Sequence, residues 1–357
     1  MKRLILILTI FMILVIPAGS ESGNLQYGGC PYSIFYDNET DKILLGNVGS
    51  DPAYVKVIDP ETLVVEKSIP IYGNPEGIIS ICNGSQILAL LSNTDLVEET
   101  EDGILQKFDY STGNIIQQLP LNLSPMAMIA DSSETYAYVT AGIGGLSTLY
   151  KINIDNLQIV DFEEKCGSMC WDIALSPDES KIYLIDHKAY KTGIEDPILR
   201  YQPCIGVFRI SDLELIKRIF TVPVLDLLDT DNNGRLFASN ATAGEGIDGS
   251  RLYESLYVID TNTDEIIRTF LFDDYGIYKI DVDESGQYLY GTVVDVEEDS
   301  ALGSLLELNL TDYSYRYIPV ADVALLEIAI APVNGGNRVF CISEDENDNY
   351  IYYKDIE

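Results

Sequence analysis

Hydrophobic and polar residues alternate in short runs along most of the chain, which is the pattern of half-buried β-strands. The stretch Glu134 to Lys165 shows the pattern clearly: two alternating runs, TYAYVTA and STLYKINI, flank a glycine-rich connector, and a third run, LQIVDFEE, follows an Asp-Asn turn. Three short antiparallel strands are predicted here.

The pattern repeats with a period of about 45 residues, which indicates a repeat architecture. Six units contain four such runs each, which we call a to d in chain order. Their first runs are YSIFYD after Pro31, GIISI after Pro75, MAMIAD after Pro125, and then CWDIALS, VLDLLD and IYKIDV. A seventh unit begins with LLEIAIA and has only three runs, since the chain stops after YIYYKDI.

The missing strand is predicted at the other end of the chain. The segment Gly23 to Tyr27 (GNLQY) precedes the first unit and has the length of one strand. Pairing it with the final run would close the seven units into a ring without an exposed sheet edge. The sequence therefore predicts an all-β fold, a seven-bladed β-propeller of four-stranded antiparallel blades over residues 21–357.

Several of these segments resemble the YVTN-repeat β-propellers. Tyr138-Val139-Thr140-Ala141 with YKINID downstream, WDIALSPDESKIYLI and SLYVIDTNTDEIIRTF carry the resemblance, which covers residues 24–357. The YVTN tetrapeptide is complete nowhere, and the equivalent positions read LLGN, LALL, YLID, FASN, LYGT and FCIS. The resemblance implies a secreted or cell-surface propeller of the kind common among archaeal surface-layer-related proteins.

The first twenty residues are predicted to be a signal peptide. Lys2 and Arg3 precede an apolar run from Leu4 to Ile16, and small residues up to Ser20 provide a cleavage site. Because the segment contains no acid, its removal changes the net charge from −35 to −37. Such a surface repels nucleic acid and attracts cations, so we expect a soluble, extracytoplasmic monomer without a nucleic-acid partner.

A charged cluster is predicted at the mouth of the central channel, which the a strands line. Aligning these strands on the residue before an apolar pair places Ser33, Ile78 and Met128 in the first three blades, and four charged residues in the next four: Asp172, Asp226, Lys279 and Glu327. Two interpretations are open, namely a buried ion-pair network and a pocket for a small polar ligand or a cation. The ion-pair network is the favoured interpretation, because charge clusters are often structural.

A calcium site is a second candidate. Asp229-x-Asp231-x-Asn233-Gly234 matches the beginning of a calcium-binding loop, but the twelfth position is Asn240 where such loops have Glu. The segment also coincides with an ordinary turn between strands a and b. The turn is the favoured interpretation, and Ca²⁺ is the one cofactor considered.

Histidine and cysteine restrict the chemistry further. His187 is the only histidine, which excludes mechanisms that need several imidazoles, and it is expected at a strand end on the surface. In an exported chain the six cysteines permit disulfides. Cys204 is predicted to pair with Cys166 or Cys170, whereas Cys82 and Cys341 lie in predicted strands as thiols. Trp171 is expected to pack rather than to form a sugar platform.

Glycosylation is permitted by sequons in predicted turns and loops, namely at Asn38, Asn83, Asn240 and Asn309, and at Asn122, where a following Pro125 weakens the case.

Three functions are consistent with these features. The first is a non-enzymatic exported propeller that serves as a binding or interaction module at the cell surface, with a protein or glycan partner. The second is a lactonase-like or other metal-assisted hydrolase with a channel site, and the third is a propeller subunit of an extracytoplasmic redox complex. Several b–c connections are long and are predicted on one face, where loops on a rigid scaffold commonly bind ligands: Ser92 to Gly103, Asp186 to Cys204, Asn240 to Glu254 and Asp295 to Gly303.

Overall fold

A computed structural model describes most of the chain after the first twenty-one residues. The described residues are 22–26, 30–48, 52–92, 103–121, 123–143, 146–190, 201–221, 225, 227–240, 244–245, 251–252, 254–272, 275–295, 300–333, 335–343 and 350–356. The predicted signal peptide lies outside these residues, so export stays a prediction. Among the described residues no helix is long and apolar enough to cross a membrane.

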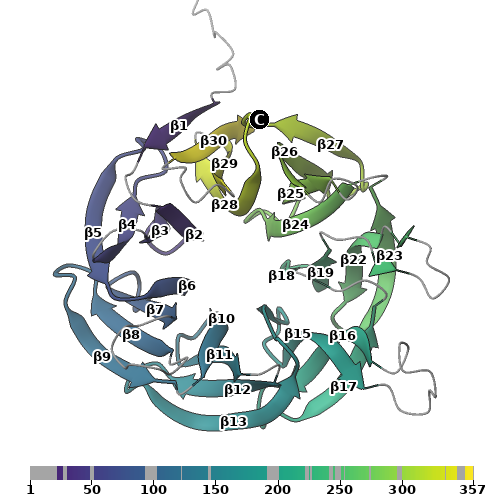
Figure 1. Cartoon of the computed structure of the whole chain (residues 1–357), viewed down its shortest axis with the longest axis horizontal. Coiled ribbons are helices and arrows are strands. Elements are labelled where there is room, and N and C mark those ends of the chain that lie inside the picture. The colour runs from purple at the N-terminus through teal and green to yellow at the C-terminus, as the bar shows by residue number, and fades with distance from the viewer. Residues whose placement is uncertain are drawn as a thin grey trace, which may run out of the picture.

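Seven four-stranded antiparallel sheets are arranged as a ring around a central channel, which confirms the predicted fold class (Figure 1). In every blade strand a lies at the channel and strand d at the outer rim. Hydrogen bonding follows chain order within six of the blades. The repeat predicted from the sequence therefore corresponds to one blade.

The first four blades contain the strands that the alternating runs predict. Blade 1 consists of β2 (Cys30–Asp37), β3 (Lys42–Val48), β4 (Ala53–Ile58) and β5 (Val65–Ile71). Blade 2 consists of β6 (Asn74–Ile81), β7 (Gln86–Ser92), β8 (Ile104–Asp109) and β9 (Ile115–Pro120). Blade 3 consists of β10 (Ser124–Ala130), β11 (Tyr136–Ile143), β12 (Leu146–Asn153) and β13 (Gln158–Gly167). Blade 4 consists of β14 (Ile173–Leu175), β15 (Lys181–Tyr190), β16 (Tyr201–Arg209) and β17 (Leu215–Phe220).

The remaining blades include one short hairpin that the sequence did not predict. Blade 5 consists of β18 (Leu227–Thr230), β19 (Arg235–Ser239), β22 (Glu254–Asp260) and β23 (Glu265–Leu271). Its b–c connection contains the hairpin, which is formed by β20 (Gly244–Glu245) and β21 (Arg251–Leu252). Blade 6 consists of β24 (Tyr275–Val282), β25 (Tyr288–Asp295), β26 (Ser300–Asn309) and β27 (Tyr315–Pro319).

Blade 7 joins the two ends of the chain. It consists of β28 (Leu325–Val333), β29 (Gly336–Ser343), β30 (Tyr350–Ile356) and the N-terminal strand β1 (Ser22–Gln26). Strand β1 pairs antiparallel with β30, and Asn24 lies opposite Tyr352. The predicted closing strand is confirmed, and Figure 1 shows it at the rim beside β30. Strand β1 covers the edge of β30 and becomes the outer strand of this blade, so blade 7 has four strands like the other six.

The hydrophobic core is divided among the junctions between blades. Each of seven clusters of buried residues combines side chains of two neighbouring blades, and one of them joins Ile34 and Leu45 of blade 1 to Ala331 and Phe340 of blade 7. A single blade therefore buries its faces only when both neighbours are present, which makes closure of the ring part of the folding free energy.

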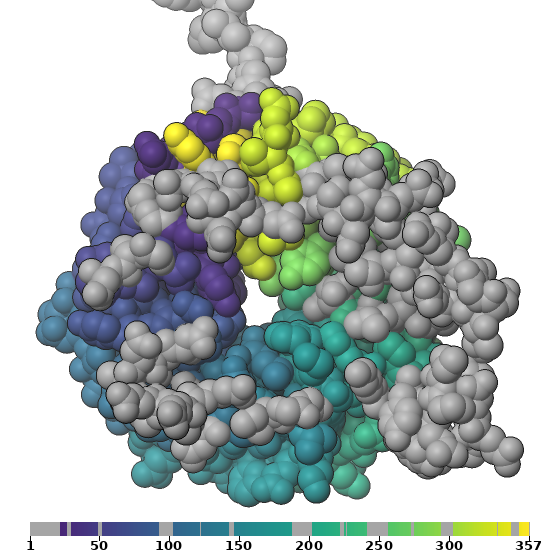
Figure 2. Space-filling model, viewed as in Figure 1, coloured from purple at the N-terminus to yellow at the C-terminus, as the bar shows by residue number. Residues whose placement is uncertain are grey.

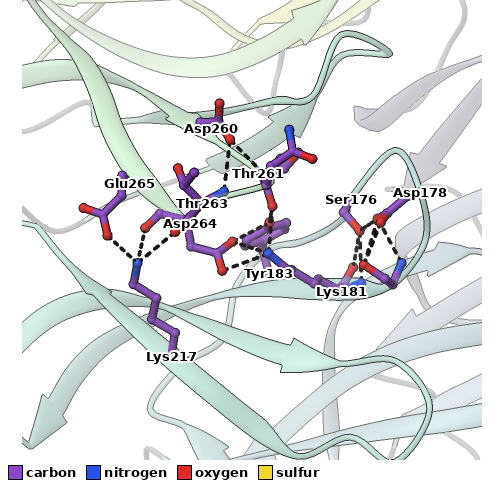
Figure 3. Close-up of polar contacts among 12 residues, drawn as sticks. Ser176, Asp178, Lys181, Tyr183, Lys217, Asp260, Thr261, Thr263, Asp264 and Glu265 are labelled. Atoms are coloured by element: carbon purple, nitrogen blue, oxygen red, sulfur yellow. Dashed lines mark hydrogen bonds and ion pairs between the residues drawn. The ribbon is translucent and has the colours of Figure 1, made fainter.

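Cationic side chains cross the same junctions. Between blades 4 and 5, Lys181 donates to the Thr261 carbonyl at 2.7 Å and to the Asp264 carboxylate at 2.9 Å (Figure 3). Lys217 donates to the Asp264 carbonyl at 2.7 Å and Tyr183 to its carboxylate at 2.9 Å. The c–d turn of one blade is thus held by charged donors of the preceding blade, and bonds of this type contribute about 1.5–3 kcal/mol each.

The arrangement recurs around the ring. The cations that reach backbone carbonyls in the c–d turn of the next blade are Lys67, Lys107, Lys151, Lys181, Lys217, Arg235 and, from blade 7 to blade 1, Arg338. These turns expose carbonyls because the chain passes through a left-handed residue in each: Leu63, Gly113, Leu157, Leu213, Asp264 and Tyr313 have φ between 48° and 71°.

Candidate functional site: the channel

The channel contains a cavity of about 280 Å³ beside blades 5, 6 and 7. Its lining comes from the inner strands β2, β18, β24 and β28 and from Asp172 before β14, and the charged members are Asp172, Asp229, Lys279, Asp281 and Glu284. Figure 2 shows that the centre of the ring is open. The cavity is narrow and rich in carboxylates, so cations and small polar molecules are the ligands that match its charge.

Lys279 and Glu327 form an ion pair inside this channel. The Lys279 ammonium lies 3.1 Å from the Glu327 carboxylate, and both side chains are mostly buried. Burial lowers the pKa of Lys279, but Glu327 and Asp172 raise it further, so the net direction is upward. Lys279 is therefore held as a cation. This contact is the one predicted for the two residues in the ion-pair interpretation.

Three aspartates of the channel each fasten one blade to the next. The Asp172 carboxylate accepts a bond from the Leu228 amide at 2.7 Å, and Asp229 accepts from Val282 at 2.7 Å. Asp281 repeats the contact, because its carboxylate accepts from the Ile330 amide at 3.1 Å. The amides belong to the inner strand of the following blade, where strand a has no other β-ladder on its channel side. These carboxylates satisfy backbone donors that water alone would otherwise solvate.

Burial raises the pKa of all three carboxyl groups. It raises the pKa of Asp172 to about 6, against the opposing effect of Lys279 and backbone amides. It raises the pKa of Asp229 to about 7, to which Asp172 and Asp231 contribute as like charges. Burial and Asp229 raise the pKa of Asp281 well above its usual range. All three side chains are partly open to the channel, and the water there screens part of the effect of burial.

The predicted cluster is brought together in part. Asp172, Lys279 and Glu327 interact with one another, as the causes of the raised pKa of Lys279 show. Asp226 lies outside the described residues. The ladder pair nearest the a–b turn contains Thr230 in blade 5 and Val282 in blade 6. Three residues back along strand a from each of them, Leu227 is level with Lys279, whereas the alignment had placed Asp226 there. The alignment by apolar pairs is one residue out in blade 5, and the residue it missed there is Asp229.

The alignment is also one residue out in blades 2 and 3, in the opposite direction. By register, Gly77 and Ala127 are level with Ser33, where the alignment placed Ile78 and Met128. Glu76 therefore lies at the mouth, and the Tyr32 hydroxyl donates to its two oxygens at 3.0 and 3.1 Å.

Burial raises the pKa of Glu76, against the opposing bonds of Ser92 and Tyr32. The motif Pro-x-x-apolar at Pro31, Pro75 and Pro125 gives the correct register, because in each of these blades a β-bulge follows that proline.

The calcium candidate is a turn in this structure. Asp231 accepts from the Asn233 and Arg235 amides at 2.9 Å each and from the Arg235 guanidinium at 2.6 Å, whereas Asp229 faces the channel. The Asn233 amide bond is the usual closure of an Asx turn. Among the described residues, no group of three or more His, Cys, Asp or Glu side chains has the arrangement of a metal site. Calcium binding stays a prediction, tested below.

The cysteines differ from the predicted pairing. No disulfide joins any of the six, and Cys166, Cys170 and Cys204 are buried thiols. The close pair is Cys166 with Cys170, whose sulfurs lie 3.9 Å apart. Cys341 is buried in its strand and Cys82 is half-buried in an a–b turn.

Trp171, which was predicted to pack, and His187, which was predicted at a strand end on the surface, lie close to each other near these cysteines. Trp171 is 47% exposed rather than packed, and its ring centre is 6.3 Å from that of His187. His187 lies within β15 and its amide donates to the Ser168 carbonyl at 3.1 Å.

The predicted glycosylation sites differ in how exposed their asparagine side chains are. Asn38 and Asn83 are exposed in a–b turns, and Asn309 is half-buried with its side chain bonded to the Thr311 amide at 2.8 Å. Asn240 is only 2% exposed, so a glycan there would require the chain around it to open. Asn122 lies outside the described residues. Glycosylation therefore stays a prediction at the other four positions, and burial argues against it only at Asn240.

Comparison with known proteins supports the fold but identifies no family. No protein-family model matches the chain, and no curated protein matches it. Among solved structures, the crystal structure of the Cps50 (Swd1) β-propeller domain of Myceliophteria thermophila superposes with a TM-score of 0.68. The two are 10% identical, and the alignment covers 95% of this chain and 100% of that one. At this identity the likeness shows a β-propeller and nothing about ligands.

Proposed function

We propose that the chain is an exported, non-enzymatic β-propeller of the YVTN type that acts as a binding module at the cell surface or outside the cell. Propellers commonly serve as protein-interaction modules, and a closed ring with seven interblade cores is a rigid support for such a role. The predicted signal peptide and the resemblance to the YVTN repeats support the location. The acidic surface favours a partner with exposed cationic groups.

The observation that carries the proposal is the placement of the b–c connections. Strand b ends and strand c begins at the face opposite the a–b turns, so the connections formed by residues 93–103, 191–200 and 240–253 begin and end at one face. The a–b turns of the same blades are short, for example residues 82–85 between β6 and β7. The blade 6 connection that was predicted to be long is also short, because β26 begins at Ser300 and leaves only residues 296–299.

Export is tested by expressing the full chain with a C-terminal tag in its source cells and sequencing the N-terminus of the mature protein. We expect a chain that begins after Ser20 in the envelope or the medium. Recovery of an intact, cytoplasmic chain would overturn the location.

Binding is tested separately on the purified protein. Residues 93–102 and 241–250 are each replaced by a short Gly-Ser link, and cross-linking to envelope fractions is compared with that of the parent chain. The matched control changes the opposite face, at Ser285 of the blade 6 turn, by Ser285→Gln. We expect cross-links to fall at least several-fold in the first two variants only; equal cross-linking in all three would refute the assignment of this face.

A second candidate function rests on the channel carboxylates. The pKa values of about 6 and about 7 for Asp172 and Asp229 lie where proton transfer near neutral pH requires them, which a metal-assisted hydrolase would need. Both carboxylates, however, already accept backbone amide bonds. We therefore rank the hydrolase below the binding module, and the calcium measurement described in the Discussion tests it. The redox-complex hypothesis stays a prediction without a supporting contact.

A further inference from the structure

Two cysteines at the junction of blades 3 and 4 are held together by the local backbone. Cys166 lies near the end of β13, and Cys170 precedes β14. Lys165 and Met169 both adopt left-handed conformations, with φ of 60° and 55°. The chain therefore turns sharply on either side of Gly167, where an added Cβ would lie 2.7 Å from the Cys170 sulfur. Only glycine fits at that position without displacing the thiol.

Surrounding residues fix both cysteines in this turn. The Cys170 amide donates to the Ser147 hydroxyl at 3.0 Å, and the Thr140 hydroxyl donates to the Cys170 carbonyl at 2.9 Å. The Cys166 thiol lies 3.3 Å from the Ser147 carbonyl. The Ser168 amide between the two cysteines donates to the Asp186 carboxylate at 3.0 Å. Each part of the turn is thus anchored to strands that do not depend on the thiols.

We propose that Cys166 and Cys170 form an intramolecular disulfide when the protein meets a disulfide oxidant such as oxidised glutathione. The two thiols lose two protons and two electrons as the sulfur–sulfur bond forms, and the oxidant's disulfide accepts the electrons and leaves as two thiols. The sulfurs lie 3.9 Å apart, and a bond of about 2 Å requires them to approach by roughly 2 Å, which rotation of the side chains can provide. This inference does not depend on the proposed function.

The bond would close a five-residue loop in the backbone connection between two blades. This connection runs from the outer strand of blade 3 to the inner strand of blade 4, and the same junction is packed around Leu149 and Ile173. The contact with Cys170 and then burial raise the pKa of the Cys166 thiol, so reactive thiolate is scarce in the folded protein. Cys166 is 4% exposed and Cys170 0%. Exchange in the folded state is therefore slow, and a bond formed during folding in an oxidising compartment persists.

The test is oxidative refolding of the full chain. Protein unfolded under reducing conditions is refolded in mixtures of oxidised and reduced glutathione, quenched with N-ethylmaleimide, digested and analysed by mass spectrometry. We expect a peptide that links Cys166 to Cys170 and is lighter by two hydrogen atoms than the dithiol. The variants C204S and C341S should retain the link, whereas C166S and C170S should lose it.

A stability measurement separates a real bond from a failure to fold. The oxidised parent chain should melt several degrees above the reduced chain, and C166S should fold with a melting temperature that does not respond to the oxidant. Alkylation of both thiols after refolding at every glutathione ratio would overturn the proposal, as would a link between Cys204 and either of them.

Discussion

Replacement of Asp229 by Asn should weaken the pH dependence of stability more than any comparable loss of surface charge. The Asp229 carboxylate faces the channel and accepts bonds from the Thr230 and Val282 amides, both at 2.7 Å. Asparagine preserves one acceptor oxygen and removes the titrating group. The lost bond costs about 1 kcal/mol at every pH, so the slope against pH, and not the stability itself, measures the carboxylate.

The sign follows from where the proton binds. Burial raises the pKa of Asp229 in the folded protein to about 7, against 3.8 as its ordinary value. Between these values the folded state binds a proton that the unfolded state does not, so acidification from about pH 8 to about pH 5 stabilises the protein. Below about pH 4 this gain is complete, and acids whose folded pKa is lowered become protonated at a cost. One such acid is Asp59, where Lys42 and the Thr62 amide lower the pKa.

The magnitude has an upper limit set by the two pKa values. A difference between about 7 and 3.8 corresponds to about 4 kcal/mol, and channel water screens part of it, so we expect about 1–2 kcal/mol over the pH range. Urea unfolding at several pH values gives the slope for the parent chain, for D229N and for E163Q. Glu163 is exposed on β13, so E163Q changes the net charge equally outside the channel. Equal slopes in D229N and E163Q would refute the reasoning.

Three further perturbations test other parts of the structure. Deletion of residues 22–26 should lower the melting temperature by several degrees and promote aggregation, because it exposes the edge of β30. Thermal unfolding followed together with light scattering tests this, and an unchanged melting temperature would contradict closure by β1. K279M should lower the free energy of unfolding in urea by roughly 2–4 kcal/mol, because it leaves Glu327 unpaired. Adding E327Q to the same chain should recover part of this loss, and no recovery would argue against coupling of the two residues. Millimolar calcium should leave the melting temperature of the parent chain within about 1 °C of its value in chelator, because Asp231 is paired with Arg235. A rise that D231N abolishes would establish the calcium site in the turn, whereas a rise that only D172N abolishes would favour the channel hydrolase.

The fold could be predicted from the sequence because every blade repeats the same alternation of residues. The closing strand could be predicted for the same reason: a seventh unit with three runs requires a fourth, and only Gly23 to Tyr27 was available. Periodicity specifies which residues form strands, but it leaves the register uncertain by one residue wherever a β-bulge intervenes. The β18–β19 ladder of blade 5 has no bulge, whereas β24 has one between Ile277 and Ile280, and this difference makes Leu227 level with Lys279.

The contacts of the site were less predictable than its location. The pair Lys279 and Glu327 was anticipated because both precede an apolar pair in strands without an alignment error. The carboxylate-to-amide contacts of Asp229 and Asp281 were not, since they depend on how closely two inner strands approach. The close approach of the Cys166 and Cys170 sulfurs depends on backbone dihedral angles that the sequence does not reveal.

The distribution of cations explains why the channel carboxylates use backbone donors. The chain has 22 Lys and Arg against 57 Asp and Glu, and most cations described above hold c–d turns at the blade junctions. Among the described residues lining the cavity, Lys279 is the one cation beside four acids. Amide donors and raised pKa values compensate the remaining carboxylates, so a ligand that displaces a proton from Asp172 or Asp229 must supply positive charge itself. A cationic ligand therefore matches the channel, whereas the macromolecular partner proposed above is expected at the face where the longer b–c connections begin and end.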